Sequence, residues 1–435
     1  MIASLARRLP FFYGWLIVAI AFVTMAIGVN ARTSFSLLFA PVVAEFGWER
    51  ATVAGAFSFG FLTSALLSPM LGKLMDTKGP RFCIEMGICL VAAGLLLAPL
   101  TTAPWHLYLT LGMLVGGGSV CLTFTGQSLY LPNWFVRRRG LAISVAFSGV
   151  GVGSILLLPA FQTWIERYGW RTACIILGVG LLCVLAPLNL FVARKPSDLG
   201  LEPDGDAAAI PGGPVKRSNV VDPAWVAVDW TLGRAVKTFR FWMLALGYFT
   251  GLFTWYAVQV HQTKYLVEIG YSPKVAAWAL GAVSLAGIPG QIGLGWLSDR
   301  IGREWVWSIG SFGFTLTFLA LLVMKTSPSM PWLYAMVIAQ GLLGYGVTAV
   351  FGTVAFEIFE GKHYGSIFGS LSLASLAGGA TGPFVLGAMY DRLGTYDQAF
   401  WLCFALTFVS SAAIWFARPG KVRAVAGRIA ATAMR

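Results

Sequence analysis

The chain has 435 residues, of which 57% are hydrophobic and 11% are charged, and its formal net charge is +13. A soluble domain carries about 25% charged residues, so this composition excludes an ordinary globular enzyme. The high hydrophobicity equally excludes a disordered chain. The basic excess does not indicate a nucleic-acid partner, because the sequence offers no soluble domain to carry it. We therefore expect a protein of the lipid bilayer.

The apolar segments predict twelve transmembrane helices, since a bilayer-spanning helix needs about 20 residues. They lie at 11–42, 51–72, 82–102, 106–134, 140–163, 171–193, 241–267, 275–297, 305–324, 331–356, 365–390 and 397–417. Runs such as 15–29 and 179–192 lack the alternation of β-barrel strands. The expected fold is all-α, with an N-terminal six-helix bundle (1–193), a cytoplasmic linker (194–240), a C-terminal six-helix bundle (241–417) and a basic cytoplasmic tail (418–435).

The lysines and arginines predict the orientation. With both termini in the cytoplasm, all but eight of the 31 basic residues fall in cytoplasmic segments, as the positive-inside rule requires. The eight others are Arg32, Arg50, Arg167, Arg171, Lys264, Lys274, Lys325 and Arg392. We expect an inner (plasma) membrane protein that acts as a monomer. The six cysteines have no C-x-x-C spacing, so neither a disulfide framework nor a metal site is expected.

The two halves of the sequence repeat each other. Residues 45–48 recur as 268–271 and residues 72–76 recur as 295–299, both at an offset of 223 residues. Residues 139–142 are echoed by 364–367 at an offset of 225. Duplication of a six-helix half is typical of secondary transporters, whose substrate sites lie near the bilayer midplane where the repeats meet.

The repeated loop carries a motif. Residues 295–304 read G-W-L-S-D-R-I-G-R-E, which resembles the G-x-x-x-D-R-x-G-R-R loop of the major facilitator superfamily. The copy at 72–81 has Thr77 in place of the first arginine. Residues 13–15 (Y-G-W) and 134–149 are similar to the two signatures of the monocarboxylate porter family. This resemblance, in a homologue that we take to be bacterial, implies a carrier of lactate, pyruvate and related acids, usually with a proton; oxalate/formate exchangers are close relatives.

Polar residues recur at helical spacing within several spans. Ser119, Thr123, Gln127 and Tyr130 are spaced by four, four and three residues, which places them on one face of a regular helix. Gln291 lies on a comparable polar face of the eighth span. In the tenth span, Tyr345 lies one helical turn before Thr348. These faces either line an aqueous cavity or form interhelical hydrogen bonds.

Charged residues inside spans are more diagnostic because they are costly to insert. Arg32 lies in the outer half of the first span, where it either receives an anionic substrate or extends to the interface. Gln259, His261 and Lys264 lie in the outer half of the seventh span. Lys264 is spaced to pair with Glu268, and His261 either titrates or remains a neutral structural residue.

One expected feature of the family is missing. Many members carry an arginine in the eighth span, often one turn after an acidic residue; here Gln291 and Gly287 occupy those positions. Residues 287–290 and 378–383, each with a proline among glycines, are predicted to break their helices. A half-helix that starts there would offer free N–H groups to a carboxylate, or the proline is only a kink.

The acidic residues of the two repeated loops are candidates for gating. Asp76 and Asp299 either cap the next helix or pair with one of the arginines at 137–139 in one conformational state. Arg138, Arg300 and Arg303 are assigned to the same gating group.

The sequence therefore predicts a secondary transporter of small monocarboxylates, with L-lactate or pyruvate as first candidates and a proton as the co-transported ion. The candidate substrate-binding residues are Arg32, Gln127, Tyr130, Gln259, His261, Lys264, Gln291 and Tyr345. Alternatives are an oxalate/formate type of anion exchanger, an exporter of lipophilic compounds, and a non-transporting membrane sensor. No G-K-[ST] loop occurs and the G-x-G-x-G at 149–153 follows no strand, so neither an enzyme nor a cofactor is expected.

Overall fold

The structure is a computed structural model that describes residue 6 and residues 9–205 and 219–428. The proline- and glycine-rich part of the expected linker and the end of the expected tail lie outside these residues. Within the described residues the chain is helical, and its single β contact is an isolated bridge between Val220 and Arg423. This all-helical architecture confirms the expected fold class.

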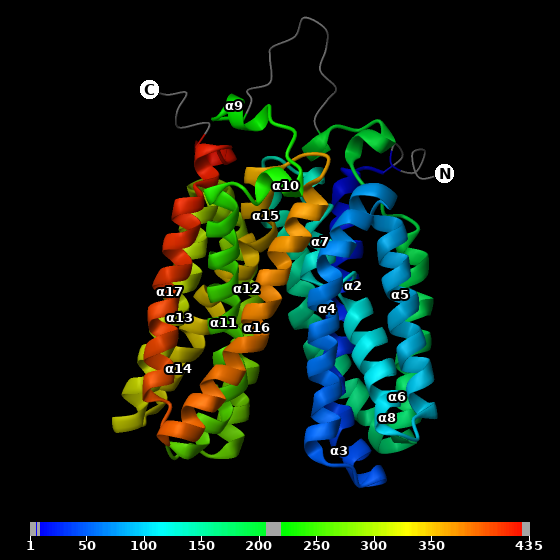
Figure 1. Cartoon of the computed structure of the whole chain (residues 1–435), viewed down its shortest axis with the longest axis vertical. Helices are drawn as coiled ribbons and strands as arrows, with labels where there is room; N and C mark the ends of the chain where they lie inside the picture. The colour runs from blue at the N-terminus through cyan, green and yellow to red at the C-terminus, as the bar shows by residue number, and fades with distance from the viewer. Residues whose placement is uncertain (1–5, 7–8, 206–218, 429–435) are drawn as a thin grey trace, which may run out of the picture. The chain divides into compact units, whose positions relative to one another are not determined.

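The helices follow one another in two groups (Figure 1). The first group comprises α2 (Tyr13–Thr33), α3 (Phe35–Phe46), α4 (Arg50–Lys78), α5 (Pro80–Leu97), α6 (Pro104–Leu107), the π-helical segment η2 (Tyr108–Gly117), α7 (Phe124–Ser128) and α8 (Arg139–Asn189). The second comprises α9 (Pro223–Val226), α10 (Leu232–Ala235), α11 (Phe239–Glu268), α12 (Pro273–Ile301), α13 (Arg303–Thr326), α14 (Met330–Ile338), the π-helical segment η6 (Ala339–Gly344), α15 (Gly346–Phe359), α16 (Tyr364–Leu393) and α17 (Asp397–Ala417).

Ten helical stretches of the described chain are long and apolar enough to cross a membrane. One of them, α8, has 51 residues and contains a non-helical glycine, Gly169, at φ 79°. A helix of that length would extend about 75 Å, more than twice the thickness of a hydrocarbon core, so α8 contains two spans. The remaining expected span, at 106–134, is divided into shorter segments. These two features reconcile the ten stretches with the twelve apolar segments of the sequence.

The segment at 106–134 is not a regular helix, which corrects the sequence-based expectation. After η2 the backbone turns, Thr123 is extended (φ −100°, ψ −169°), and α7 follows. Ser119 to Tyr130 therefore do not share one helical face. Glycines contribute to this irregular packing: a Cβ at Gly116 would lie 2.4 Å from the Cα of Gly60 in α4, so only glycine permits that approach.

Large apolar side chains are exposed along the spans. Leu66, Met70, Leu156 and Phe384 are each more than 60% exposed. In water such exposure would cost about 25 cal/mol for each Å² of apolar surface, whereas lipid chains solvate these side chains well. Together with the span lengths, the exposed residues establish a multi-pass membrane protein.

The chain divides into two compact units. The first comprises Met1–Val136, Val145–Lys216 and His363–Ser370, and the second comprises Arg137–Ser144, Arg217–Lys362 and Leu371–Arg435. The start of α8 therefore packs with the second unit and the start of α16 with the first. Within the second unit, α11, α13 and α17 lie side by side (Figure 1).

Candidate functional site

Arg32 lies near the C-terminal end of α2, two residues before the break at Ser34 that separates α2 from α3. Its side chain is half-buried, and its guanidinium carbon lies 4.5 Å from the centre of the Phe61 ring of α4. Among the described residues no carboxylate pairs with Arg32. A cation–π contact stabilises a guanidinium without neutralising it, so the positive charge remains available to an anion.

Gln127 and Tyr130 contact each other in the first unit. The Tyr130 hydroxyl donates a hydrogen bond of 2.7 Å to Oε1 of Gln127, and both side chains are buried. The Gln127 amide nitrogen has no hydrogen-bond partner in the described structure. Gln127 lies in the short helix α7 and Tyr130 follows that helix, so this buried pair does not come from the single helical face that the residue spacing predicts.

His261 of α11 connects two other parts of the second unit. Its Nε2 lies 2.9 Å from the carbonyl oxygen of Pro383 in α16, and its Nδ1 lies 3.0 Å from the hydroxyl of Tyr396, just before α17. A carbonyl oxygen only accepts, so Nε2 carries the hydrogen. In the neutral tautomer with that hydrogen, Nδ1 accepts a hydrogen bond from the Tyr396 hydroxyl.

Lys264, one turn after His261, contacts Glu268 and Tyr390. Its Nζ lies 3.6 Å from Oε1 of Glu268 and 5.0 Å from the centre of the Tyr390 ring, and its side chain is 63% exposed. Gln259 is half-buried on the same helix. The sequence offers Lys264 both as an ion-pair partner of Glu268 and as a substrate-binding residue. The structure contains the ion pair.

Gln291 and Gly287, at the positions where the family often has an arginine and an acid, face α15 and its N-terminal residue. Gln291 is buried and its Nε2 donates to Oγ1 of Thr348 at 3.1 Å. The Tyr345 ring packs on Gly287, where an added Cβ would lie 2.5 Å from the ring. The aromatic ring and the amide–hydroxyl pair thus take the place of the arginine and acid.

The predicted helix breaks do not form. Pro289 lies inside the continuous helix α12, and Pro383 lies inside the continuous helix α16. A proline removes one backbone hydrogen bond, and neighbouring helices in a membrane protein compensate for it. In α16 the Pro383 carbonyl additionally accepts from His261. The expectation that a half-helix terminus at these prolines offers free N–H groups was wrong.

Asp76 and Asp299 cap helices that lie far along the chain from them. Oδ1 of Asp76 accepts the N–H of Gly365 and Oδ2 accepts the N–H of Ser366, both at 2.8 Å, at the start of α16. Asp299 accepts the N–H groups of Gly140 at 2.8 Å and Leu141 at 3.0 Å, at the start of α8. The capped residues lie in the repeated segments 139–142 and 364–367, and each acid caps a helix of the other half of the sequence, not the next helix.

The cap at Asp299 includes a buried arginine, Arg303. Nη2 of Arg303 lies 2.7 Å from Asp299, and its Nε donates to Glu357 at 2.8 Å. Arg303 is 1% exposed and Glu357 is 3% exposed. A buried guanidinium needs such paired carboxylates to offset its desolvation. Sequence reasoning missed Glu357, although a lone acid at the end of an apolar run is a detectable signal.

The other two members of the gating group, Arg138 and Arg300, are exposed. Arg300 is exposed, with its guanidinium carbon 3.7 Å from the centre of the Trp296 ring. Arg138 is exposed, whereas the adjacent Arg139 is buried with its guanidinium over the Phe356 ring. None of these contacts by itself assigns a gating role.

The described part of the C-terminal tail lies on the same network. Nη1 of Arg423 donates to the backbone oxygen of Glu357, and Nε of Arg423 pairs with Glu360 at 3.1 Å. Arg428 pairs with Glu304 at 3.1 Å. Burial lowers the pKa of Arg423, and the Glu360 carboxylate opposes that shift. The described part of the tail, up to Arg428, therefore packs against α13 and the end of α15 in the second unit.

Known proteins resemble this chain in sequence along almost its whole length. The Major Facilitator Superfamily matches residues 14–271 and 244–431. Monocarboxylate transporter 13 of Bos taurus is 30% identical over 390 residues, which are 89% of this chain and 85% of that protein. Monocarboxylate transporter 12 of Rattus norvegicus is 26% identical over 423 residues, which are 94% of this chain and 86% of that protein.

Solved structures share the fold. The proton:xylose symporter XylE aligns with a TM-score of 0.68 at 14% identity, covering 96% of this chain and 99% of that chain. FucP in the outward conformation aligns with a TM-score of 0.65 at 15% identity, covering 92% of this chain and 97% of that chain. Identities this low show a shared fold, while the curated relatives are named as transporters rather than enzymes. The chain is therefore a transporter of the major facilitator superfamily and belongs to its monocarboxylate transporter family.

Proposed function

We propose that this transporter carries small monocarboxylates such as L-lactate or pyruvate, together with a proton, by alternating access. The observation that carries the proposal is Arg32, a half-buried cation in a spanning segment that pairs with no carboxylate in the described chain. Relatives named as monocarboxylate transporters support the same substrate class.

Placing the charged side chain of Arg32 in a membrane helix costs free energy, and a bound anionic substrate can offset that cost. An arginine near the centre of a membrane helix costs about 2.5–3.5 kcal/mol on insertion scales. The Phe61 ring offsets only part of this cost, about 0.5–2 kcal/mol for a cation–π contact. A bidentate carboxylate satisfies the guanidinium more completely. Arg32 is thus the proposed receiver of the substrate carboxylate, with Gln127 and Tyr130 as further polar groups of the first unit.

The proposed proton site is His261. In the neutral ring Nδ1 accepts from Tyr396, but a protonated ring would donate from both nitrogens. Protonation therefore requires the Tyr396 hydroxyl to rotate, while the bond to Pro383 persists. Lys264, Glu268, Tyr390 and Tyr396 surround this part of α11 and set the local field. Protonation of His261 would in this way alter the link between α11 and the chain that precedes α17.

The remaining assigned residues receive supporting roles in the same proposal. Gln259, Gln291 and Tyr345 would provide polar and aromatic contacts to the substrate, and Lys264 would attract the anion at the surface. Asp76 and Asp299, with Arg303, would stabilise one conformational state through their helix caps. Arg138 and Arg300 would take part only in the other state. We propose the inner (plasma) membrane as the location, with both termini in the cytoplasm, and a monomer as the functional form.

The test is uptake of labelled L-lactate into liposomes that contain the purified protein, under an inward proton gradient, with and without a protonophore. Proton-coupled transport predicts gradient-driven uptake that the protonophore abolishes. Arg32→Gln should weaken uptake, whereas Lys274→Gln, which removes an exposed cation at the start of α12, should not. Exchange against preloaded anion without a gradient effect would instead indicate an antiporter, and loss of uptake in both variants would contradict the role of Arg32.

A further inference from the structure

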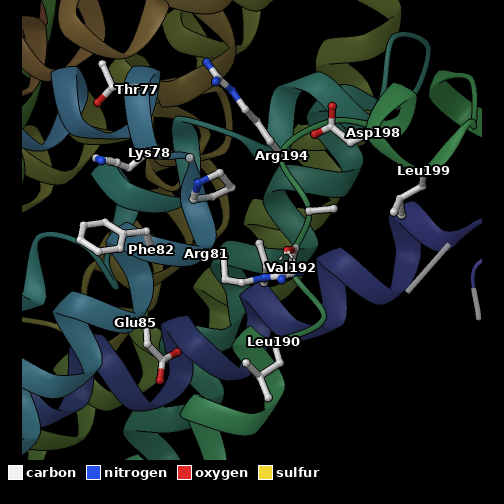
Figure 2. Close-up of a pocket in the computed structure, with 13 residues that line it drawn as sticks. Thr77, Lys78, Arg81, Phe82, Glu85, Leu190, Val192, Arg194, Asp198 and Leu199 are labelled. Atoms are coloured by element: carbon white, nitrogen blue, oxygen red, sulfur yellow. Dashed lines mark hydrogen bonds between the residues drawn. The ribbon is translucent and has the colours of Figure 1, made fainter. Parts of the chain in front are cut away.

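A cleft lined by both charged and apolar side chains opens in the first unit, at the end of the bundle where α4 meets α5 and where α8 ends. Its volume is about 690 Å³. Thr77, Lys78 and the first residues of α5 form one wall, and the other is formed by Leu190, residues 192–194, Asp198 and Leu199. Figure 2 shows the side chains of both walls in one view. No candidate substrate-binding residue lines this cleft.

Three cations line the cleft, and two of them have no hydrogen-bond or ion-pair partner among the residues that the structure describes. Arg81 is held in place, because its Nε and Nη2 both donate to the carbonyl oxygen of Val192, at 3.3 and 3.1 Å. Lys78 and Arg194 pair with no carboxylate within the described residues. In the described part of the chain, the cleft therefore holds two cations without a carboxylate beside a third, Arg81, that is hydrogen-bonded to a backbone carbonyl.

The two acids of the cleft are engaged elsewhere. Glu85 accepts the Asn189 amide at 2.7 Å, and the same amide donates to the backbone oxygen of Arg81. Asp198 accepts the backbone N–H of Lys195 at 3.3 Å. Neither acid pairs with Lys78 or Arg194, and three cations against two acids leave the lining with a net charge of +1, which favours an anion.

The first turn of α5 adds to this potential. The helix starts at Pro80 after Gly79, and no side chain caps it. Uncapped N–H groups and the helix dipole favour an anion at a helix N-terminus, phosphate in particular. Gly79 has φ 82°, a conformation that side-chain-bearing residues rarely adopt, so the turn from α4 into α5 favours glycine there.

The apolar rim of the cleft points to a lipid as the source of that anion. Phe82 is 51% exposed and Leu190 is 53% exposed, and both line the cleft. Since α5 is a membrane span that begins at Pro80, its first turn lies at the membrane surface, at the depth of phospholipid headgroups. We propose that this cleft binds the phosphate of an anionic phospholipid through Lys78, Arg194 and the start of α5, with the acyl chains against Phe82 and Leu190.

The test measures lipid binding to the full-length protein in a neutral detergent by native mass spectrometry. The probes are dioctanoyl-phosphatidylglycerol, dioctanoyl-phosphatidylcholine and glycerol 1-phosphate. The test variant is Lys78→Gln with Arg194→Gln. The matched control is Lys73→Gln with Lys195→Gln, which removes the same charge from exposed residues nearby that do not line the cleft. Equal thermal midpoints of the two double variants without lipid establish that both are folded.

We expect phosphatidylglycerol to bind the wild-type protein and the control variant with equal affinity. It should bind the test variant about 30-fold more weakly, because each cation near a lipid surface contributes about 1 kcal/mol to binding. Equal binding to the two double variants would overturn the site. Displacement of the lipid by glycerol 1-phosphate at equal concentration would overturn the lipid assignment in favour of a soluble phosphate compound. The measurement involves no transport, so its failure is distinguishable from failure of the proposed monocarboxylate transport.

Discussion

The paired substitutions Asp299→Asn and Asp76→Asn test the helix caps of the two repeated loops. Both acids accept two backbone N–H groups at the start of a distant helix. Only Asp299 also pairs with a buried arginine, because the position that corresponds to Arg303 in the first repeat is Pro80. The comparison therefore separates the contribution of the cap from that of the buried ion pair.

The geometry sets the expected magnitudes. Asparagine keeps one accepting oxygen but turns its NH2 group toward the second N–H, so Asp76→Asn should cost about 1 kcal/mol, the net contribution of one hydrogen bond. Removal of one partner of a buried ion pair costs about 3–5 kcal/mol. Arg303 keeps Glu357 at 2.8 Å, so Asp299→Asn should cost about 3 kcal/mol, at the lower end of that range. Since 1.4 kcal/mol is a factor of ten, the capped state should lose about 100-fold in relative population in Asp299→Asn and about fivefold in Asp76→Asn.

The assay compares the maximal rate of L-lactate uptake in liposomes with L-lactate binding to the purified protein. A carrier that strongly favours one state cycles slowly, so we expect Asp299→Asn to lower the maximal rate at least about tenfold, with a smaller decrease for Asp76→Asn. Binding should change by less than about twofold. Asp229→Asn, an exposed acid between α9 and α10, is the control and should retain the wild-type rate.

Two results would refute this reasoning. Equal rates for Asp299→Asn and Asp76→Asn would show that the buried ion pair with Arg303 contributes nothing to the conformational equilibrium. A loss of binding as large as the loss of rate would place Asp299 in substrate recognition instead of gating.

Three further predictions test the substrate, proton and packing arguments. Arg32→Gln should raise the apparent KM for L-lactate uptake severalfold while Arg32→Lys recovers part of the loss, and an unchanged KM would make Arg32 a structural residue. His261→Gln should abolish the response of uptake to a proton gradient while lactate exchange persists, because the imidazole is the proposed proton carrier; retained gradient dependence would contradict it. Gly116→Ala should lower the thermal midpoint, since its Cβ would lie 2.4 Å from the Cα of Gly60 and overpacking costs about 1–3 kcal/mol. Gly180→Ala, which meets no atom within 4 Å, is the control, and equal midpoints would argue against tight packing at Gly116.

The positions of the spans could be predicted because they depend on local composition. A segment of about 20 apolar residues becomes a helix in lipid whatever its neighbours are, since its backbone must satisfy its own hydrogen bonds. The apolar runs at 241–267 and 305–324 accordingly lie within α11 and α13. The prediction of a regular helix over 106–134 was wrong. The irregular backbone of this segment depends on contacts between glycines of η2 and α4, and no local sequence pattern contains such contacts.

By itself, the sequence determined the all-helical membrane fold, the internal repeat and the transporter family, because apolar length and motif spacing are properties of neighbouring residues. The tertiary structure decided which groups meet: Asp76 with the start of α16, Asp299 with the start of α8, Arg303 with Glu357, and His261 with Pro383 and Tyr396. Those partners lie far apart along the chain. Their pairing depends on how helices pack and on the need to satisfy each buried charge, which only the folded arrangement of the helices decides.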